Sequence, residues 1–153
     1  MSKPKIAVTK GDPAGVGPEV CLDLLTNAAI AEVCTPVVFG TGAVLEACAE
    51  KTGRSFSSPI VGEGELESCD EPAVLDIAAI GVEEFTPGAV NAATGRAGYE
   101  YIIRAIDLAL AGKVGGVATA PINKEALRAA GINQPGHTEI FAERTRADRA
   151  CMM

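Results

Sequence analysis

Hydrophobic and polar residues along this chain follow two alternating patterns, short apolar runs and longer amphipathic segments. The apolar runs predict strands at residues 5–9, 36–39, 73–80 and 117–120. The amphipathic segments predict a helix that begins at Pro18 and further helices at residues 42–51, 94–110, 124–130 and 139–144. Strands that alternate with helices in this way indicate an α/β fold with a mainly parallel sheet covered by helices.

The spacing of the apolar residues also predicts which helix faces are buried. In the first helix an apolar residue recurs every four positions, at Val16, Val20, Leu24 and Ala28, with Cys21 and Leu25 beside them. We expect this face to pack on the sheet. The helix at 94–110 is apolar on more than one side, so we expect several neighbours to bury it. Residues 53–71 are rich in Ser, Gly and Glu and are predicted to form a surface excursion with at most one short strand.

Residues of the kind that bind ligands follow the strand at 117–120. Asn123 is expected to cap the next helix, and Gly131 is expected to end it in a left-handed conformation. Lys124 lies at the start of that helix, where the helix dipole disfavours a cation. A nearby anion would compensate for this lysine, and a solvated side chain would explain it equally well.

The only histidine of the chain, His137, lies between a Pro-Gly turn and the last predicted helix. Thr138 is the expected N-cap of that helix, so His137 and Thr138 would face a helix end that favours an anion. A surface-loop histidine that is packed or hydrogen-bonded is the alternative. Loops of this kind lie at the carboxyl ends of strands in a parallel sheet, where ligands usually bind.

The glycine-rich segment GDPAGVGPE, at residues 11–19, joins the first strand to the first helix. It lacks the Gly-Lys-Ser/Thr of a nucleotide-binding P-loop, and Val20 stands where a dinucleotide-binding loop has its third glycine. By spacing alone, a tight strand-to-helix turn is favoured over a ligand contact, and Asp12 fits such a turn.

Composition excludes several classes of protein. The 153 residues are 48% hydrophobic, enough to bury a core and too apolar for a disordered tail. The net charge of −7 and the lack of a basic cluster argue against nucleic acid as a partner. The sequence contains no membrane span and no secretory signal, so a cytoplasmic protein is expected. Five scattered cysteines and one histidine form no closed zinc site, and the cysteines are expected to be reduced.

Four segments of the chain occur in a characteristic order: TKGDPAGVGPE at 9–19, RAGYEY at 96–101, TAPINK at 119–124 and GHTE at 136–139. Together they resemble the 4-hydroxythreonine-4-phosphate dehydrogenase family of pyridoxine and pyridoxal phosphate biosynthesis. The resemblance covers essentially the whole chain. The first segment is also similar to one in the isocitrate and isopropylmalate dehydrogenases, whose fold this family shares.

The resemblance implies an α/β/α sandwich of the isocitrate/isopropylmalate dehydrogenase type, in a two-domain subunit that forms a homodimer. It implies an oxidoreductase that uses NAD and a divalent metal (Zn, Mg or Co) to oxidise a phosphorylated hydroxy acid, whose β-keto product then loses CO2. His137 and Thr138 match the family's substrate-binding pair, and Asn123 and Lys124 are further substrate-binding candidates. The family's metal ligands lie downstream of this chain, and no catalytic or cofactor-binding residue is assigned.

Residues 1–153 are accordingly interpreted as the N-terminal portion of a two-domain α/β dehydrogenase subunit. The last residues, RACMM, resemble the opening of a buried strand, which suggests truncation near residue 150. Such a portion is expected to have no dehydrogenase activity alone and to associate through an uncovered sheet edge or apolar face. Two alternatives stay open: a relative acting on threonate- or erythronate-type 4-phosphates or on cyclic dihydrodiols, and a non-catalytic fragment.

Overall fold

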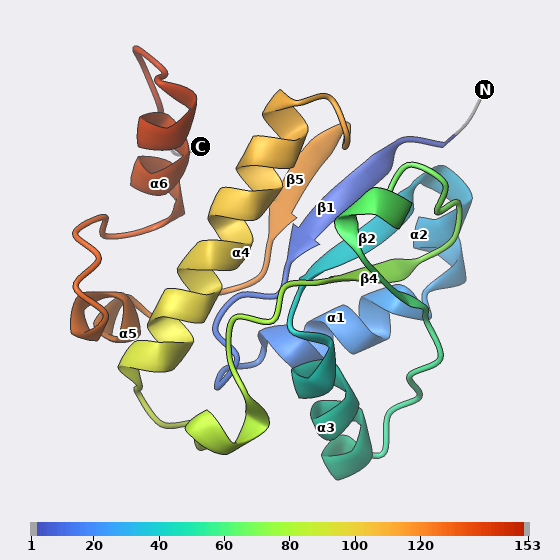
Figure 1. The fold of residues 1–153 in the computed structure, drawn as a ribbon, viewed down its shortest axis with the longest axis horizontal. Helices are drawn as coiled ribbons and strands as arrows, with labels where there is room; N and C mark the ends of the chain where they lie inside the picture. The colour runs from blue at the N-terminus through green and yellow to red at the C-terminus, as the bar shows by residue number, and fades with distance from the viewer. Residues whose placement is uncertain (1–2, 152–153) are drawn as a thin grey trace.

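Five parallel strands form the central sheet of the structure, a computed structural model that describes residues 3–151 (Figure 1). The strands are β1 (Lys5–Thr9), β2 (Thr35–Gly40), β3 (Ile60–Val61), β4 (Ala73–Asp76) and β5 (Gly116–Thr119). Their order in the sheet is β3-β4-β2-β1-β5, and all four pairs of neighbours are parallel. The mainly parallel α/β fold is therefore confirmed, and β3 is the short strand allowed within residues 53–71.

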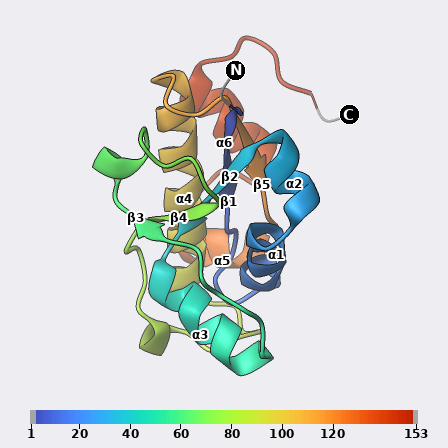
Figure 2. The ribbon, with the colours of Figure 1, turned by 90° about the vertical axis from the view of Figure 1, so that its right-hand side faces the viewer.

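Six α-helices connect and cover these strands within residues 3–151: α1 (Gly17–Leu25), α2 (Ala28–Val33), α3 (Gly42–Thr52), α4 (Ala92–Leu110), α5 (Lys124–Ala129) and α6 (His137–Thr145). Two short 3₁₀ turns, η1 (Glu63–Glu65) and η2 (Val82–Glu84), lie before and after β4. Helices α1 and α3 pack on one face of the sheet and α4 packs on the other (Figure 2). No helix described between residues 3 and 151 has the length and apolarity that a membrane crossing requires.

Strand β2 contributes to two apolar cores, because successive side chains of a strand point to opposite faces of the sheet. Val37 and Phe39 pack in one core with Ala105 of α4. Val38, between them in sequence, packs in the other core with Leu45 of α3. Burial on both faces is typical of parallel sheets and explains why β2 reads as a continuous apolar run.

The buried face of α1 includes only part of the predicted one. Val16 and Val20 are 58% and 53% exposed, so the prediction that they pack on the sheet is wrong. Cys21 and Leu25, which were predicted beside these residues on the same face, are buried, together with Gly17. Gly17 sets this register, because a Cβ at Gly17 would clash with a backbone carbonyl oxygen at the end of β1.

Helix α2 was not predicted from the sequence. Asn27 caps it, since its Oδ1 accepts the N–H groups of Ala29 and Ile30 at 3.0 and 3.3 Å. Ala28, which was expected on the first helix, is the first residue of α2. The predicted apolar face of the first helix therefore crosses a helix boundary, and only Leu24 of its later members packs partly against the core.

Two of the predicted strands differ from the structure, one in its length and one in that it does not form. The strand predicted at 73–80 ends at Asp76, whose Oδ1 accepts the N–H of Gly42 at 2.9 Å and so ties the end of β4 to the start of α3. Residues 149–151 are exposed and form no strand, contrary to the prediction for the RACMM segment. Its last two residues, Met152 and Met153, lie outside the described part of the chain.

Candidate functional site

The loops after β1 and β5 meet at the carboxyl edge of the sheet. The N–H of Asp12 donates to the carbonyl oxygen of Pro121 at 3.0 Å, and Asp12 Oδ1 accepts the N–H of Ala14 at 2.8 Å. Gly11 has a φ of 74° and lies so close to Pro121 that a Cβ would clash with its carbonyl oxygen. The glycine-rich segment is therefore a tight turn, with Asp12 in the predicted turn role, packed against the segment that leads to α5.

Two adjoining pockets lie along this edge and share Pro121 and Ile122. The first, of about 250 Å³, lies between the glycine-rich turn and Asn123. The second has a volume of about 460 Å³ and is called here the α5–α6 pocket. Its lining residues are Pro121, Ile122, Lys124, Pro135, Gly136, His137, Thr138 and Glu139. Three of the four predicted substrate-binding residues thus line one pocket of ordinary ligand size, and Asn123 lines its neighbour.

A third pocket, of about 220 Å³, lies between the glycine-rich turn, α3 and η2. Its walls are mainly apolar, with Val44, Val82 and Phe85 among them. It gathers none of the residues predicted to bind an anion. The α5–α6 pocket is therefore the stronger candidate for a polar metabolite.

Asn123 is the N-cap of α5, as predicted. Its Oδ1 accepts the N–H of Glu125 at 2.9 Å and the N–H of Ala126 at 3.0 Å. Helix α5 lies against α4 at Gly95, where a Cβ would clash with the carbonyl oxygen of Ala126. Gly131 has a φ of 77° and follows the end of α5, which confirms the left-handed stop. Gly95 was not singled out from the sequence, because only the contact with α5 gives it a role.

Helix α6 begins at His137, so the prediction that Thr138 is its N-cap is wrong. Gly136 is the N-cap, and its carbonyl oxygen accepts the N–H of Ile140 at 3.2 Å. Ile140 is 1% exposed and packs against Ile102 of α4, which fixes where the first turn of α6 lies. Glycine is among the residues that occur at N-caps, so the sequence allowed Gly136 in this position. His137 and Thr138 consequently occupy the first turn, whose leading N–H groups have no partner within the helix.

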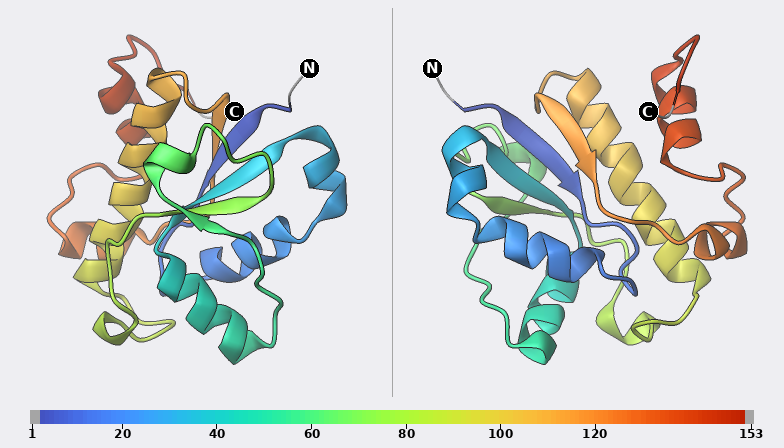
Figure 3. Two further views of the ribbon diagram at one scale, coloured as in Figure 1. Left: turned by 45° about the vertical axis from the view of Figure 1, so that its right-hand side comes forward. Right: turned by 180° about the vertical axis from the view of Figure 1, so that it is seen from behind.

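The loop and α6 run back along α4 from α5, so that the two helix starts border the same pocket (Figure 3). Ile122 and Ile140 join residues of α4 in one apolar cluster beneath them. This cluster holds the strand-to-α5 segment and α6 together. The His137 side chain is thus positioned by packed elements at both ends of its loop.

The His137 ring is half-buried, and its Nε2 atom is fully buried with no hydrogen-bond partner within residues 3–151. Burial lowers the pKa of His137 below its ordinary value of 6.5, so the ring is mostly neutral at pH 7. A buried polar atom without a partner costs free energy and calls for an explanation. His137 as a whole lines the α5–α6 pocket, so the residue is placed to contact a ligand there.

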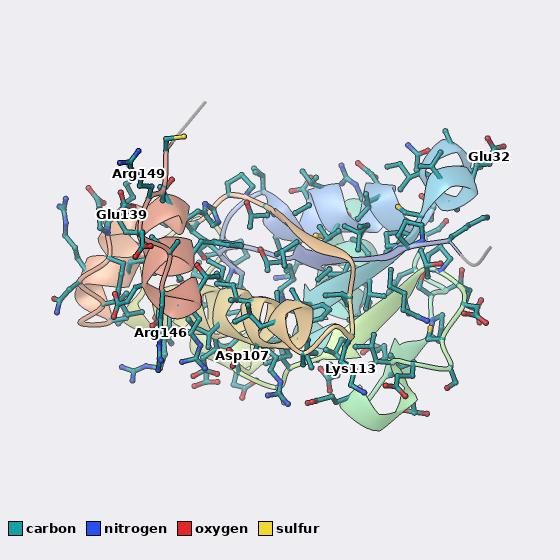
Figure 4. All side chains as sticks on the ribbon, turned by 90° about the horizontal axis from the view of Figure 1, so that it is seen from above. Glu32, Asp107, Lys113, Glu139, Arg146 and Arg149 are labelled. Carbon is teal, nitrogen blue, oxygen red and sulfur yellow. The ribbon has the colours of Figure 1, made fainter. Side chains whose placement is uncertain are left out.

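The charges around the pocket are of both signs. Lys124 is exposed at the first position of α5, and Glu139 is exposed in the first turn of α6 and lines the same pocket (Figure 4). The α6 dipole stabilises Glu139, and Lys124 is the cation that lines the pocket. An anion held between Lys124 and the first turn of α6 would be favoured by both the lysine charge and the free N–H groups.

No cluster of three or more His, Cys, Asp or Glu side chains that could hold a metal ion occurs among residues 3–151. The cysteines at 21, 34, 48, 69 and 151 are free thiols, in agreement with the prediction that they are reduced. The donor set of the α5–α6 pocket therefore does not by itself fit a divalent metal.

Comparison with known proteins identifies relatives of this chain. A family model described as "Pyridoxal phosphate biosynthetic protein PdxA" matches residues 32–153. A 4-hydroxythreonine-4-phosphate dehydrogenase from Trichlorobacter lovleyi is 39% identical over 155 residues, which cover 99% of this chain and 46% of that protein.

Two solved structures resemble the fold. The crystal structure of a 4-hydroxythreonine-4-phosphate dehydrogenase from Burkholderia phymatum matches 97% of this chain and 46% of its own, with a TM-score of 0.87 and 35% identity. That of a terephthalate 1,2-cis-dihydrodiol dehydrogenase from Burkholderia xenovorans LB400 matches 88% and 39%, with a TM-score of 0.69 and 30% identity.

The chain spans less than half the length of these relatives. The matches nevertheless run through β1 to α6, and so include the glycine-rich turn and both helix starts at the α5–α6 pocket. The sequence similarity and the structural similarity therefore cover the same residues of this chain. The chain belongs to the PdxA family of pyridoxal phosphate biosynthetic proteins.

Proposed function

We propose that this chain forms one wall of the substrate pocket of an NAD-dependent 4-hydroxythreonine-4-phosphate dehydrogenase. His137, Thr138, Lys124 and Asn123 are the proposed substrate-binding residues. The observation that carries the proposal is that His137 lines one pocket with Lys124 and the first turn of α6. The relatives named as 4-hydroxythreonine-4-phosphate dehydrogenases support the choice of substrate.

The proposed reaction oxidises the substrate's CH–OH group by hydride transfer to NAD, after which the β-keto acid loses CO2. In this reaction the residues of the chain bind and orient the anion. Lys124 contributes positive charge, the first turn of α6 contributes N–H donors, and His137 contributes a neutral imidazole. We assign no step to a metal within this chain, because its pocket residues do not form a metal site.

The remaining parts of the active site are proposed to come from outside these residues. The relatives are more than twice as long, which leaves room for NAD and for a divalent metal (Zn, Mg or Co) to be bound there. We propose that residues 1–153 act as the N-terminal portion of such a subunit, in a cytoplasmic homodimer, and do not reduce NAD alone. An assay with 4-hydroxythreonine-4-phosphate, NAD and each metal tests this, and turnover by the chain alone would contradict it.

The binding role can be tested without catalysis. ¹⁵N-labelled chain is titrated with 4-hydroxythreonine-4-phosphate, and we expect chemical shifts to move at Lys124, His137 and Thr138. His137→Ala should weaken binding at least tenfold, as expected for a charge-assisted hydrogen bond worth about 1.5–3 kcal/mol. Asn133→Ala, an exposed residue of the same loop that does not line the pocket, is the matched control. Equal affinity of the His137→Ala variant and the control would remove His137 from the site.

A cyclic dihydrodiol is a second candidate substrate, favoured by the similarity to the terephthalate dihydrodiol dehydrogenase structure. Inorganic phosphate distinguishes the two. If the pocket recognises a phosphate group, phosphate should compete with the substrate and shift the same resonances. Binding of a dihydrodiol that phosphate does not displace would favour the second candidate.

A further inference from the structure

Lys10 follows β1 directly and is 0% exposed, although lysine is among the residues least often buried. Its side chain crosses the end of β2 beside Gly40. A Cβ at Gly40 would lie 2.9 Å from the Cβ of Lys10 and 3.0 Å from its Cδ and Cε. The absence of a side chain at Gly40 therefore makes room for the buried lysine.

The amine of Lys10 has few polar contacts. Its Nζ donates to the carbonyl oxygen of Thr41 at 3.3 Å and lies 5.1 Å from the centre of the Tyr101 ring. The Thr41 hydroxyl donates to the carbonyl oxygen of Ile77 at 2.7 Å, so the Tyr101 hydroxyl is the donor in its 2.7 Å bond with Thr41. These contacts join the ends of β1, β2 and β4 to α4 around one amine.

In the described part of the chain, the Lys10 amine forms no ion pair that would stabilise its charged form. None of the ion pairs among residues 3–151 includes Lys10. The titratable groups that face it are Cys21 of α1, Cys48 of α3, Asp76 of β4 and Tyr101 of α4. Asp76 is the carboxylate among them, and one of its oxygens already accepts the N–H of Gly42.

Burial lowers the pKa of Lys10 from 10.5 to about 7 and raises the pKa of both Cys21 and Tyr101 to about 12. The thiol and the phenol consequently stay protonated near neutral pH and offer no negative charge to the amine. An ammonium group has three donors, and within residues 3–151 Lys10 has one acceptor at hydrogen-bond distance. The site suits an uncharged amine better than a charged one.

We propose that Lys10 is a proton-dependent latch, whose uncharged amine fastens the carboxyl ends of β1, β2 and β4 to α4 and whose protonation loosens that junction. The proposal rests on the packing of Lys10 against Gly40, Thr41 and Tyr101, and does not depend on the proposed function. Between about pH 7 and 10.5 the unfolded chain holds a proton on this lysine and the folded chain does not. Stability supplied by the latch therefore rises with pH through this window and is lost towards pH 7.

Urea unfolding at pH 7.5 and 8.5 tests the latch with Lys10→Met, which keeps an unbranched side chain and removes the charge. The folding equilibrium constant of the wild type, divided by that of the variant, should rise roughly five- to tenfold between these pH values. Contributions of the cysteines, Tyr101 and His137 are present in both proteins and cancel in the ratio. Lys51→Met, at an exposed position of α3, is the control, and its ratio to wild type should not change. A constant ratio for Lys10→Met would overturn the proposal.

If the Lys10→Met variant does not fold, the pKa of Lys10 can be measured directly in the wild-type chain. In the wild-type chain with ¹⁵N-labelled lysine side chains, the Lys10 Nζ resonance is followed from pH 6 to 10.5. Titration with a midpoint between pH 6 and 8 supports the latch. A midpoint above pH 9.5, where ordinary lysines titrate, overturns it.

Discussion

His137 is the one imidazole of the chain, and burial sets its charge. Because burial lowers its pKa below 6.5, the unfolded chain takes up a proton at a higher pH than the folded chain does. The stability that this histidine contributes is therefore present above pH 6.5 and is lost as the pH falls below it. An anion bound beside the ring would oppose that loss by stabilising the imidazolium.

We predict that phosphate raises the pKa of His137. The measurement is the ¹H NMR titration of the ring proton, which is unambiguous in a chain with one histidine. A saturating concentration of inorganic phosphate should move the midpoint upward, because a nearby negative charge favours the protonated form. The same titration in Lys124→Ala tests whether that lysine helps to hold the anion, and should show a smaller upward shift. An unchanged midpoint in the wild type would mean that no phosphate binds beside the ring.

Asn123 has two roles that substitution can separate. Asn123→Ala removes the cap of α5 and should destabilise the chain by about 1 kcal/mol in urea unfolding. Asn123→Asp keeps an N-cap oxygen and should retain nearly all of the stability, but its charge should weaken binding of phosphate. If Asn123→Asp leaves phosphate binding unchanged, Asn123 is a structural cap and has no part in the site.

The packing of α4 against α5 depends on Gly95. We predict that Gly95→Ala destabilises the chain by about 1–3 kcal/mol, because the added Cβ meets the backbone at Ala126 and forces α5 away from α4. Gly98→Ala in the same helix is the matched control, since a Cβ there would meet its nearest atom at an ordinary 3.4 Å. Higher helix propensity should leave Gly98→Ala neutral or more stable. Equal unfolding free energies for the two variants would contradict the predicted contact.

The strands and the long helix α4 could be predicted from the sequence because their burial follows a local period. In the first helix, the local sequence pattern did not determine which face is buried. Its four-residue spacing fits Val16 and Val20 as well as Cys21 and Leu25, and the contact of Gly17 with the end of β1 selects the second set. The start of α6 was likewise decided by a distant contact, the burial of Ile140 against α4. Helix rotation and helix start depend here on partners that are far away in sequence.

The environments of Lys10 and of the α5–α6 pocket also depend on residues that are distant in sequence. Nothing local marks Lys10 as buried, because the space it fills is created by Gly40 and the aromatic ring beside it comes from α4. His137 and Lys124 could be selected from helix-end signals, and the fold then brought them into one pocket. The sequence alone was thus enough to select His137 and Lys124 as candidates. That they line the same pocket follows only from the tertiary structure.

Strand β5 forms one outer edge of the sheet. Among the described residues β5 pairs only with β1 (Figure 3). Ala118 and Thr119 of β5 are exposed. An unpaired edge offers backbone N–H and C=O groups to a further strand. Val16 and Val20, both more than half exposed, form a second apolar surface on α1. We therefore predict that the 153-residue chain associates in solution, as light scattering or sedimentation over a range of concentrations would detect.

Two charge substitutions identify the surface that associates. Ala118→Lys should shift the equilibrium toward monomer if the edge of β5 is used, because a charged edge disfavours strand pairing. Val20→Lys should do so if the valine surface of α1 is used. Val33→Lys is the control, since Val33 is 69% exposed and belongs to α2, a different helix from the one that carries Val20. A wild-type chain that stays monomeric at all concentrations would show that neither surface is covered by a second copy, and the edge of β5 would then be free for strands from the remainder of a full-length family member.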